Sequence, residues 1–228
     1  MRLVDQSANA EASVRGEQTK RLIVDTAVRL FREHGYEKTT MRAIAQAAGL
    51  SVGNAYYYFP SKDHLVQEFY AQVQDAHHAA WTVASDAATE FVDRLRIAML
   101  TGVEVMAAYH GFAGKFVKTA VEPGSPASPF SEDSRPARER SLALFRSVID
   151  GSTIKIDDEL RADLPELLWL SYMGVTLYWL HDMSPGQAKT RLLVEKAVPL
   201  IDRLVALSRL RLLRPITREA LALYRLLR

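Results

Sequence analysis

The chain contains no cysteine, no long apolar run and no extended alternation of polar and apolar residues. The lack of cysteine excludes disulfides, zinc–thiolate sites, iron–sulfur clusters and cysteine nucleophiles, and it permits a reducing compartment. No segment reaches the roughly 18–20 uninterrupted apolar residues of a membrane-spanning helix. Residues 1–16 are polar and do not contain the apolar core of a signal peptide. We therefore expect a cytoplasmic protein without membrane contact.

The chain also has little net charge, +2 over 228 residues. This excess lies in residues 1–65, which hold nine Lys/Arg and seven Asp/Glu. So small a charge does not by itself indicate nucleic acid as a partner. With 48% hydrophobic and 25% charged residues, the composition is that of a globular protein and excludes disordered and collagen-like classes.

Apolar residues recur at helical spacing nearly everywhere, which predicts an all-α fold. The stripe of a first helix consists of Ile23, Ala27, Leu30 and Phe31. Short helices are predicted over 40–47 and 51–58, and a long helix from Ser61 to about Trp81. Residues 122–136 hold four prolines and predict an exposed, mobile loop.

Two apolar helices are predicted in the second half of the chain. The segment 164–180 is apolar all round, with Pro165 at its expected start, so it must be covered on every side. The next helix has one apolar stripe: Leu193, Ala197, Leu200, Ile201, Leu204 and Leu207. A membrane span is the alternative for the first segment, but Glu166 lies within it. We predict a homodimer through 164–181 and 187–207.

The tail 209–228 carries six arginines and one acidic residue. A short amphipathic helix fits 216–227. This helix either packs onto the dimer helices, which we favour, or contacts DNA.

The two short helices near residue 50, joined by a turn that contains glycine, are typical of a helix-turn-helix. Ile44, Ala48 and Leu50 are predicted to face inward from the first helix and the turn, and Ala55 and Phe59 from the second. Gly49 stands where a left-handed backbone would turn the chain. If Ala55 and Phe59 face inward, the helical geometry places the residues between them, such as Tyr56 and Tyr57, on the outer side of the second helix.

The outward face of the second helix is the candidate DNA-reading surface. Its residues are Ser51, which caps the helix, Val52, Gly53, Asn54, Tyr56 and Tyr57. Val52 can touch a thymine methyl group, and Asn54 can both donate and accept at a base edge. Tyr56 and Tyr57 can reach phosphate or sugar. The alternative is that these tyrosines are core residues, but four consecutive aromatic positions on a helix cannot all face inward.

Three flanking residues complete the candidate DNA-binding set. Thr40 and Lys62 stand at predicted helix N-termini, where phosphate is favoured, and Arg42 lies between them in the chain. The alternative for Lys62 is a solvated surface lysine.

Residues 21–65 closely resemble the tetracycline-repressor (TetR) family of bacterial transcription regulators. The resemblance covers roughly the first third of the chain and rests on segments that include Gly35-Tyr36, Thr39-Thr40-Met41-Arg42-Ala43-Ile44-Ala45, Ala47-Ala48-Gly49-Leu50-Ser51, and Tyr56-Tyr57-Tyr58-Phe59-Pro60-Ser61-Lys62. Two positions depart from the usual pattern, because Ala55 is commonly leucine and Tyr58 commonly histidine.

The resemblance implies a three-helix DNA-binding domain over 17–65, after a disordered arm 1–16, and a helical ligand-binding and dimerisation domain over 66–228. It also implies a homodimeric repressor of a palindromic operator that releases DNA when a small molecule binds. No cofactor or metal is expected.

Aromatic and methionine residues cluster in the middle helices and suggest a largely apolar effector. The candidate ligand-binding residues are Trp81, Met106, Tyr109, His110, Phe112, Phe145, Trp169 and Tyr172. Core packing is the alternative for each of them alone. An enzyme is disfavoured, since no metalloprotease, nucleophile-elbow or phosphate-loop pattern occurs. The remaining alternative is a helical adaptor protein that has lost DNA binding.

Overall fold

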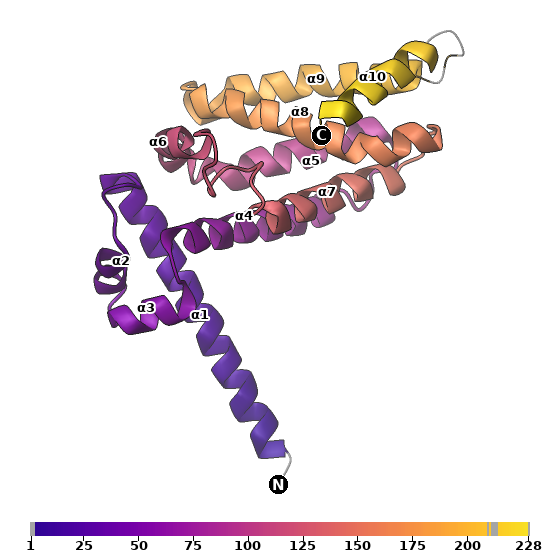
Figure 1. Cartoon of the computed structure of the whole chain (residues 1–228). Coiled ribbons are helices and arrows are strands. Elements are labelled where there is room, and N and C mark those ends of the chain that lie inside the picture. Colours follow the sequence, from indigo (N-terminus) through magenta and orange to yellow (C-terminus); the bar gives the residue numbers. More distant parts are fainter. Residues whose placement is uncertain (1–2, 209, 211–213, 228) are drawn as a thin grey trace. The chain divides into compact units, whose positions relative to one another are not determined.

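The computed structural model describes residues 3–208, 210 and 214–227, and within these residues the secondary structure is entirely helical (Figure 1). The helices are α1 (Leu3–His34), α2 (Met41–Ala47), α3 (Val52–Tyr58), α4 (Lys62–Ala84), α5 (Phe91–Ala107), α6 (His110–Ala120), α7 (Arg135–Asp150), α8 (Asp158–His181), a 3-10 turn η1 (Pro185–Gln187), α9 (Ala188–Leu207) and α10 (Arg214–Leu227). The all-α prediction is confirmed. Among the described helices, none combines the length and apolarity needed to cross a bilayer.

The chain divides into two compact units that do not follow the expected domain boundary. The first unit comprises residues 1–72 and 109–135, and the second comprises 73–108 and 136–228. Helix α6 therefore belongs with the helix-turn-helix, and α4 passes from one unit into the other. The reason is aromatic packing, because Phe112 of α6 stacks on Phe31 of α1 with ring centroids 6.1 Å apart.

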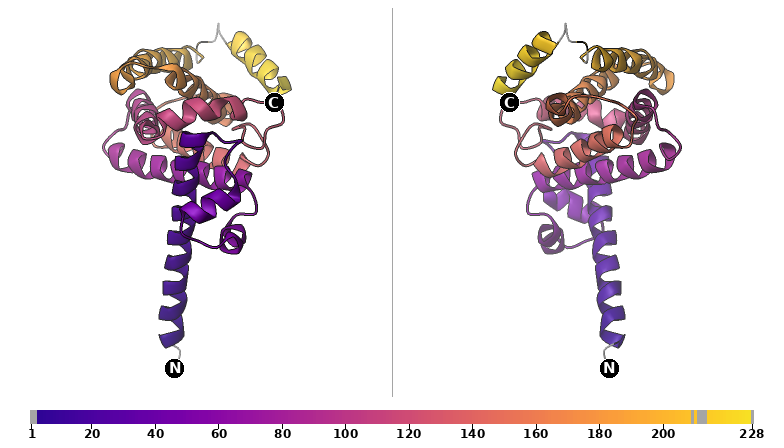
Figure 2. Two further views of the ribbon diagram at one scale, coloured as in Figure 1. Left: turned by 90° about the vertical axis from the view of Figure 1, so that its left-hand side faces the viewer. Right: turned by 90° about the vertical axis from the view of Figure 1, so that its right-hand side faces the viewer.

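Helix α1 is longer than the sequence predicted. Residues 1–16 were expected to be a disordered arm, but α1 begins at Leu3 and continues well past α2 and α3 as one helix (Figure 2). The segment before Gly16 has no proline and includes several alanine and glutamate or glutamine residues, which favour helix.

The predicted loop is built as a series of turns held against α4. Gln67 Nε2 donates to the Pro126 carbonyl at 2.8 Å, and the Tyr70 hydroxyl donates to the Ala127 carbonyl at 2.8 Å. Ala127 is fully buried and Ser134 is 1% exposed. The expectation of an exposed loop is therefore wrong at these positions, because side chains of α4 satisfy its carbonyl groups.

Helix α8 begins earlier than Pro165. The Asp157 carboxylate accepts a hydrogen bond from the Leu160 amide at 2.8 Å and caps the helix, so Pro165 lies inside it rather than at its start. Pro165 is buried in the described structure.

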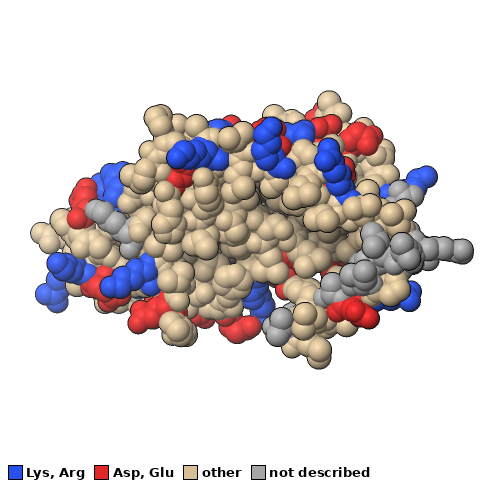
Figure 3. All heavy atoms as spheres, turned by 90° about the horizontal axis from the view of Figure 1, so that it is seen from above, with Lys and Arg blue, Asp and Glu red and all other residues tan. Residues whose placement is uncertain are grey.

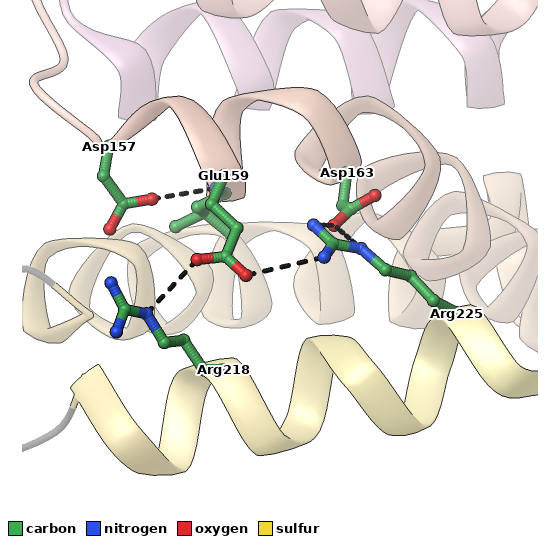
Figure 4. Close-up of polar contacts among 6 residues, drawn as sticks. Asp157, Glu159, Asp163, Arg218 and Arg225 are labelled. Atoms are coloured by element: carbon green, nitrogen blue, oxygen red, sulfur yellow. Dashed lines mark hydrogen bonds and ion pairs between the residues drawn. The ribbon is translucent and has the colours of Figure 1, made fainter.

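Helix α10 packs onto α8, as we favoured for the tail (Figure 4). Leu221 is 4% exposed, and Arg225 donates to the Asp163 carboxylate from Nε at 2.9 Å and from Nη2 at 2.6 Å. Arg218 pairs with Glu159 at 3.3 Å. Residues 209, 211–213 and 228 of the tail lie outside the described residues.

A buried carboxylate connects α8 to α9. Asp182 Oδ2 accepts from the Thr190 amide and hydroxyl at 2.7 Å each, and Oδ1 accepts from the Ser184 amide and hydroxyl. Burial alone would raise the pKa of Asp182, but these four hydrogen bonds outweigh it and lower that pKa below its usual value.

We predict that Asp182→Asn lowers the free energy of unfolding near neutral pH, because an amide cannot accept all four bonds. A carboxyl group with a lowered folded-state pKa stabilises the fold above its unfolded-state pKa and loses this effect as pH falls. The difference between wild type and variant should therefore shrink below about pH 4 in urea-unfolding curves. The exposed Asp86→Asn serves as the control and should show neither effect; a difference for Asp182→Asn that stays constant down to low pH would contradict this explanation.

Candidate nucleic-acid interface

The helix-turn-helix is fixed by two side-chain caps and a glycine turn. Thr40 Oγ1 accepts from the Ala43 amide at 3.2 Å and starts α2, and Ser51 Oγ accepts from the Asn54 amide at 3.1 Å and starts α3. Gly49 has φ +69°, the left-handed conformation predicted for the turn. The cap predicted at Ser51 is confirmed, and Thr40 stands at the N-terminus of α2 as predicted, where it also caps the helix.

Buried apolar residues pack α3 against α2 and the rest of the first unit. Ile44, Ala45 and Ala55 are fully buried, and Phe59 is 4% exposed. Because Ala45 and Ala55 have only a methyl group, the backbones of α2 and α3 can approach closely. The inward orientation predicted for Ile44, Ala55 and Phe59 is confirmed.

The opposite face of α3 is open to solvent. Tyr57 is 81% exposed, Tyr56 49% and Val52 37%, and Gly53 and Asn54 are exposed as well. The Tyr57 ring is held edge-on to that of Tyr58, with centroids 5.2 Å apart. The structure therefore confirms that these residues face outward; their contact with DNA stays a prediction.

Two of the flanking residues already have partners within the protein. The Thr40 hydroxyl oxygen caps α2, as above, and the Lys62 ammonium donates to the Tyr36 carbonyl at 2.8 Å. Arg42 is exposed on α2. Sequence reasoning missed the link between Lys62 and Tyr36, because the two are separated by 26 residues and no pattern connects them.

The candidate ligand-binding residues divide between the two units. Tyr109, His110 and Phe112 lie in the first unit, where Tyr109 and Phe112 pack against Phe69 with centroid distances of 4.9 Å and 5.6 Å. Core packing explains these two aromatic residues. The second unit contains the other five: Trp81, Met106, Phe145, Trp169 and Tyr172.

Within the second unit, the buried polar groups of Tyr172 and His77 lie side by side among apolar side chains. The Tyr172 hydroxyl lies 3.8 Å from Met106 Sδ, and its ring lies 5.6 Å from that of His77 and 5.9 Å from that of Phe145. Gly102 makes room for this hydroxyl, since a Cβ atom there would collide with it. In the described part of the chain, Ser141 Oγ and Trp81 Nε1 are buried without a hydrogen-bond partner.

His77 is a member of this interior that sequence reasoning did not select. It is 1% exposed, and Nε2 lies 2.7 Å from the Ala98 carbonyl. A carbonyl only accepts, so Nε2 carries the hydrogen and Nδ1 is an acceptor. Burial lowers the pKa of His77 and favours this neutral form. No sequence pattern predicts this position of His77, because it depends on the tertiary contact between His77 and Gly102.

Comparisons with known proteins agree with this architecture. The family model for bacterial regulatory proteins of the tetR family matches residues 23–69, and the model for the tetracyclin repressor-like C-terminal domain matches residues 94–223.

Curated relatives share mainly the N-terminal region. The transcriptional repressor KstR of Rhodococcus jostii is 40% identical over 62 residues, which are 27% of either chain. KstR2 of Mycobacterium tuberculosis is 29% identical over 107 residues, 47% of this chain and 51% of the relative. The chain thus spans between a quarter and about half of the length of these relatives.

Solved structures of low identity share the fold. A TetR transcriptional regulator from Nitrosomonas europaea aligns with a TM-score of 0.62 at 17% identity, covering 79% of this chain and 96% of that one. FadR of Thermus thermophilus, a repressor solved in complex with lauroyl-CoA, aligns with a TM-score of 0.55 at 20% identity, covering 78% and 92%. Because the C-terminal family model alone matches more than half of the residues, the chain belongs to the TetR family.

Proposed function

We propose that the protein is a homodimeric transcriptional repressor that binds a palindromic DNA operator through α3 and releases it when a small, largely apolar molecule binds in the second unit. The observation that carries the proposal is the solvent-exposed face of α3 on a buried scaffold. A helix-turn-helix presents the first turns of its second helix to the major groove. An adaptor without DNA binding would have no need for exposed Tyr56 and Tyr57 at these positions.

Each exposed residue of α3 has a separate role in this proposal. Asn54 reads a base edge, because its amide both donates and accepts. Tyr56 and Tyr57 contact phosphate or sugar, which orients α3 without reading sequence. Val52 and Gly53 allow close approach to the groove floor, while Thr40, Arg42, Ser51 and Lys62 add contacts to the backbone of the DNA.

We predict that Asn54→Ala relaxes base preference and costs about 1–3 kcal/mol at one base pair of each half-site. Tyr57→Phe, which removes only an exposed hydroxyl, should instead weaken binding to all sequences alike. Fluorescence anisotropy with the DNA upstream of the coding region and with single-base variants of that DNA measures both effects. Gln46→Ala, an exposed position of α2, is the control. Equal losses on all duplexes for Asn54→Ala would contradict base reading.

The dimer is supported by an apolar surface on α8 and α9. Val194, Val198 and Val205 face the core of the second unit, yet α9 carries leucines on another face. Five leucines and one tyrosine of α8 and α9 are 43–59% exposed: Leu177, Tyr178, Leu192, Leu200, Leu204 and Leu207. Figure 3 views the side where α8, α9 and α10 lie, and the middle of this face shows no Lys, Arg, Asp or Glu. An apolar surface of this kind is typical of an interface with another chain.

A two-fold dimer also suits operator recognition. One helix-turn-helix contacts few base pairs, and two copies related by symmetry read two half-sites about one helical turn apart. This arrangement raises selectivity against the many other sites of a genome.

We predict that Leu204→Glu converts a dimer into a monomer at micromolar concentration, because a carboxylate would be buried without a partner. Light scattering coupled to size exclusion measures the mass. Leu223→Glu on α10 is the matched control, since Leu223 is as exposed as Leu204 at 59%. A wild-type protein that is monomeric at this concentration would contradict the dimer.

The effector site is proposed for the interior of the second unit around Tyr172. Tyr172 packs among Met106, Phe145 and His77, and its hydroxyl and the His77 ring are neutral polar groups. Elsewhere in this unit, the Ser141 hydroxyl and the Trp81 indole are buried without a hydrogen-bond partner. The guanidinium of Arg94 is occupied by backbone carbonyls, among them Ala88 at 2.9 Å and Ser147 at 3.0 Å. These groups favour a ligand with an apolar body and an uncharged hydrogen-bonding group. The lauroyl-CoA bound by FadR, a protein of the same fold, makes an acyl chain a reasonable first probe.

We predict that Gly102→Ala displaces the Tyr172 ring and lowers the free energy of unfolding by about 1–3 kcal/mol. Urea unfolding measures this loss, and DNA release by the effector should weaken in the same variant. Gly111→Ala is the control, because a Cβ atom at Gly111 meets nothing within 4 Å. Equal stability of the two alanine variants would show that the close approach of Tyr172 to α5 is not a constraint.

A further inference from the structure

Tyr36 occupies the turn between α1 and α2 and joins three helices through its ring and hydroxyl. The ring lies 5.0 Å from that of Phe31 on α1 and meets Phe116 of α6 edge-on at 5.5 Å. The hydroxyl donates to Asp63 Oδ1 in the first turn of α4 at 2.5 Å. Burial and this bond raise the pKa of Tyr36, so the hydroxyl stays protonated and remains a donor. The position of the ring is therefore fixed from several sides.

Tyr36 also holds the side chain of Lys62, the first residue of α4, in two ways. Lys62 Nζ donates to the Tyr36 backbone carbonyl at 2.8 Å and lies 4.2 Å from the centre of the Tyr36 ring. A cation over the face of an aromatic ring is attracted by the negative charge on that face. An ammonium group has three hydrogens, and one carbonyl uses only one of them. The ammonium therefore has hydrogens left for another acceptor, while Tyr36 holds its nitrogen atom in place.

The neighbouring carboxylate would otherwise compete for this ammonium. Asp63 lies next to Lys62 in the chain, and an ion pair between them would neutralise the charge that a phosphate requires. The Tyr36 hydroxyl binds Asp63 instead, and no ion pair between Lys62 and Asp63 occurs in the described structure. One tyrosine therefore engages both side chains and keeps them apart.

We propose that Tyr36 is a positioning residue for DNA binding, which holds the Lys62 ammonium oriented toward a phosphate of the DNA backbone. The inference rests on the proposed function and adds to it a residue that does not itself touch DNA. A freely rotating lysine would lose its side-chain freedom on binding, whereas a lysine that is already held in place loses less. The competing explanation is that Lys62 only fastens α4 to the turn after α1.

The test measures how DNA affinity depends on salt in four proteins: wild type, Lys62→Met, Tyr36→Leu and the double variant. The probes are a labelled duplex of about 30 base pairs from the DNA upstream of the coding region and a scrambled duplex of equal length. Each phosphate contact that is lost reduces the slope of log affinity against log salt by about one unit. We expect Lys62→Met and Tyr36→Leu to reduce this slope equally for each subunit, and the double variant to reduce it no further.

Controls separate positioning from folding. Both variants keep the backbone carbonyl that accepts from Lys62. Tyr36→Phe keeps the ring but frees Asp63, so it should retain only the part of the slope that depends on the ring, whereas Tyr36→Leu loses both effects. Lys189→Met, on the exposed surface of α9, should leave the slope unchanged. Thermal unfolding of every variant shows which of them are folded during the assay. If Tyr36→Leu does not fold, pentafluorophenylalanine at position 36 preserves the ring shape but reverses the charge on its face, and should produce the same loss of slope.

Three outcomes overturn the inference. An unchanged slope for Lys62→Met means that this lysine contacts no phosphate. The second outcome is that the salt slope of Tyr36→Leu is unchanged and that its affinity loss adds to that of Lys62→Met in the double variant. In that case Tyr36 is structural only. In both cases wild-type binding persists, so the proposed function stands. Failure of the wild-type protein to bind either duplex would overturn the proposed function and this inference together.

Discussion

The close packing of α2 and α3 is the constraint on which the exposed face of α3 depends, the face that we propose contacts DNA. Ala45 and Ala55 are fully buried, so a larger side chain at either position would require its neighbours to repack. The Thr40 and Ser51 hydroxyls fix the residue at which each helix begins. A shift of α3 by one residue would rotate it by about 100°, and Asn54 would no longer lie on the outer face.

In the second unit, the residues of α9 that stabilise the chain itself differ from those that are exposed and could contact another chain. Valines of α9 complete the core of the chain itself, whereas the leucines of the same helix stay on the surface. Helix α10 packs on α8 by more than apolar contact. Arg225 of α10 pairs with the almost fully buried carboxylate of Asp163 on α8. Any position of α10 that separated this pair would leave the Asp163 carboxylate buried without a partner, which costs free energy. The C-terminal helix thus has one defined docking position.

Much of the fold followed from local patterns in the sequence. Three features were predictable because each depends on neighbours within one or two helical turns: the stripe of Ile23, Ala27 and Phe31, the cap at Ser51 and the outward tyrosines of α3. The start of α8 differs from the prediction, because proline is typical of the first turn of a helix, whereas Pro165 lies inside α8 and Asp157 caps it. The contact between Tyr36 and Lys62, the position of Gly102 beside Tyr172 and the membership of α6 in the first unit depend on tertiary packing, for which a single sequence carries no periodic signal.

The first unit is assembled from two stretches of chain that are separated by α5 and the second part of α4. Its aromatic core draws Phe31 and Phe69 from the first stretch and Phe112 and Phe116 from the second. Cutting the chain after Gln72 would leave half of these rings without partners and expose the remainder to water. The unit that contains the helix-turn-helix is consequently not a detachable module, and a fragment or chimera that keeps it intact must carry residues 109–135 as well.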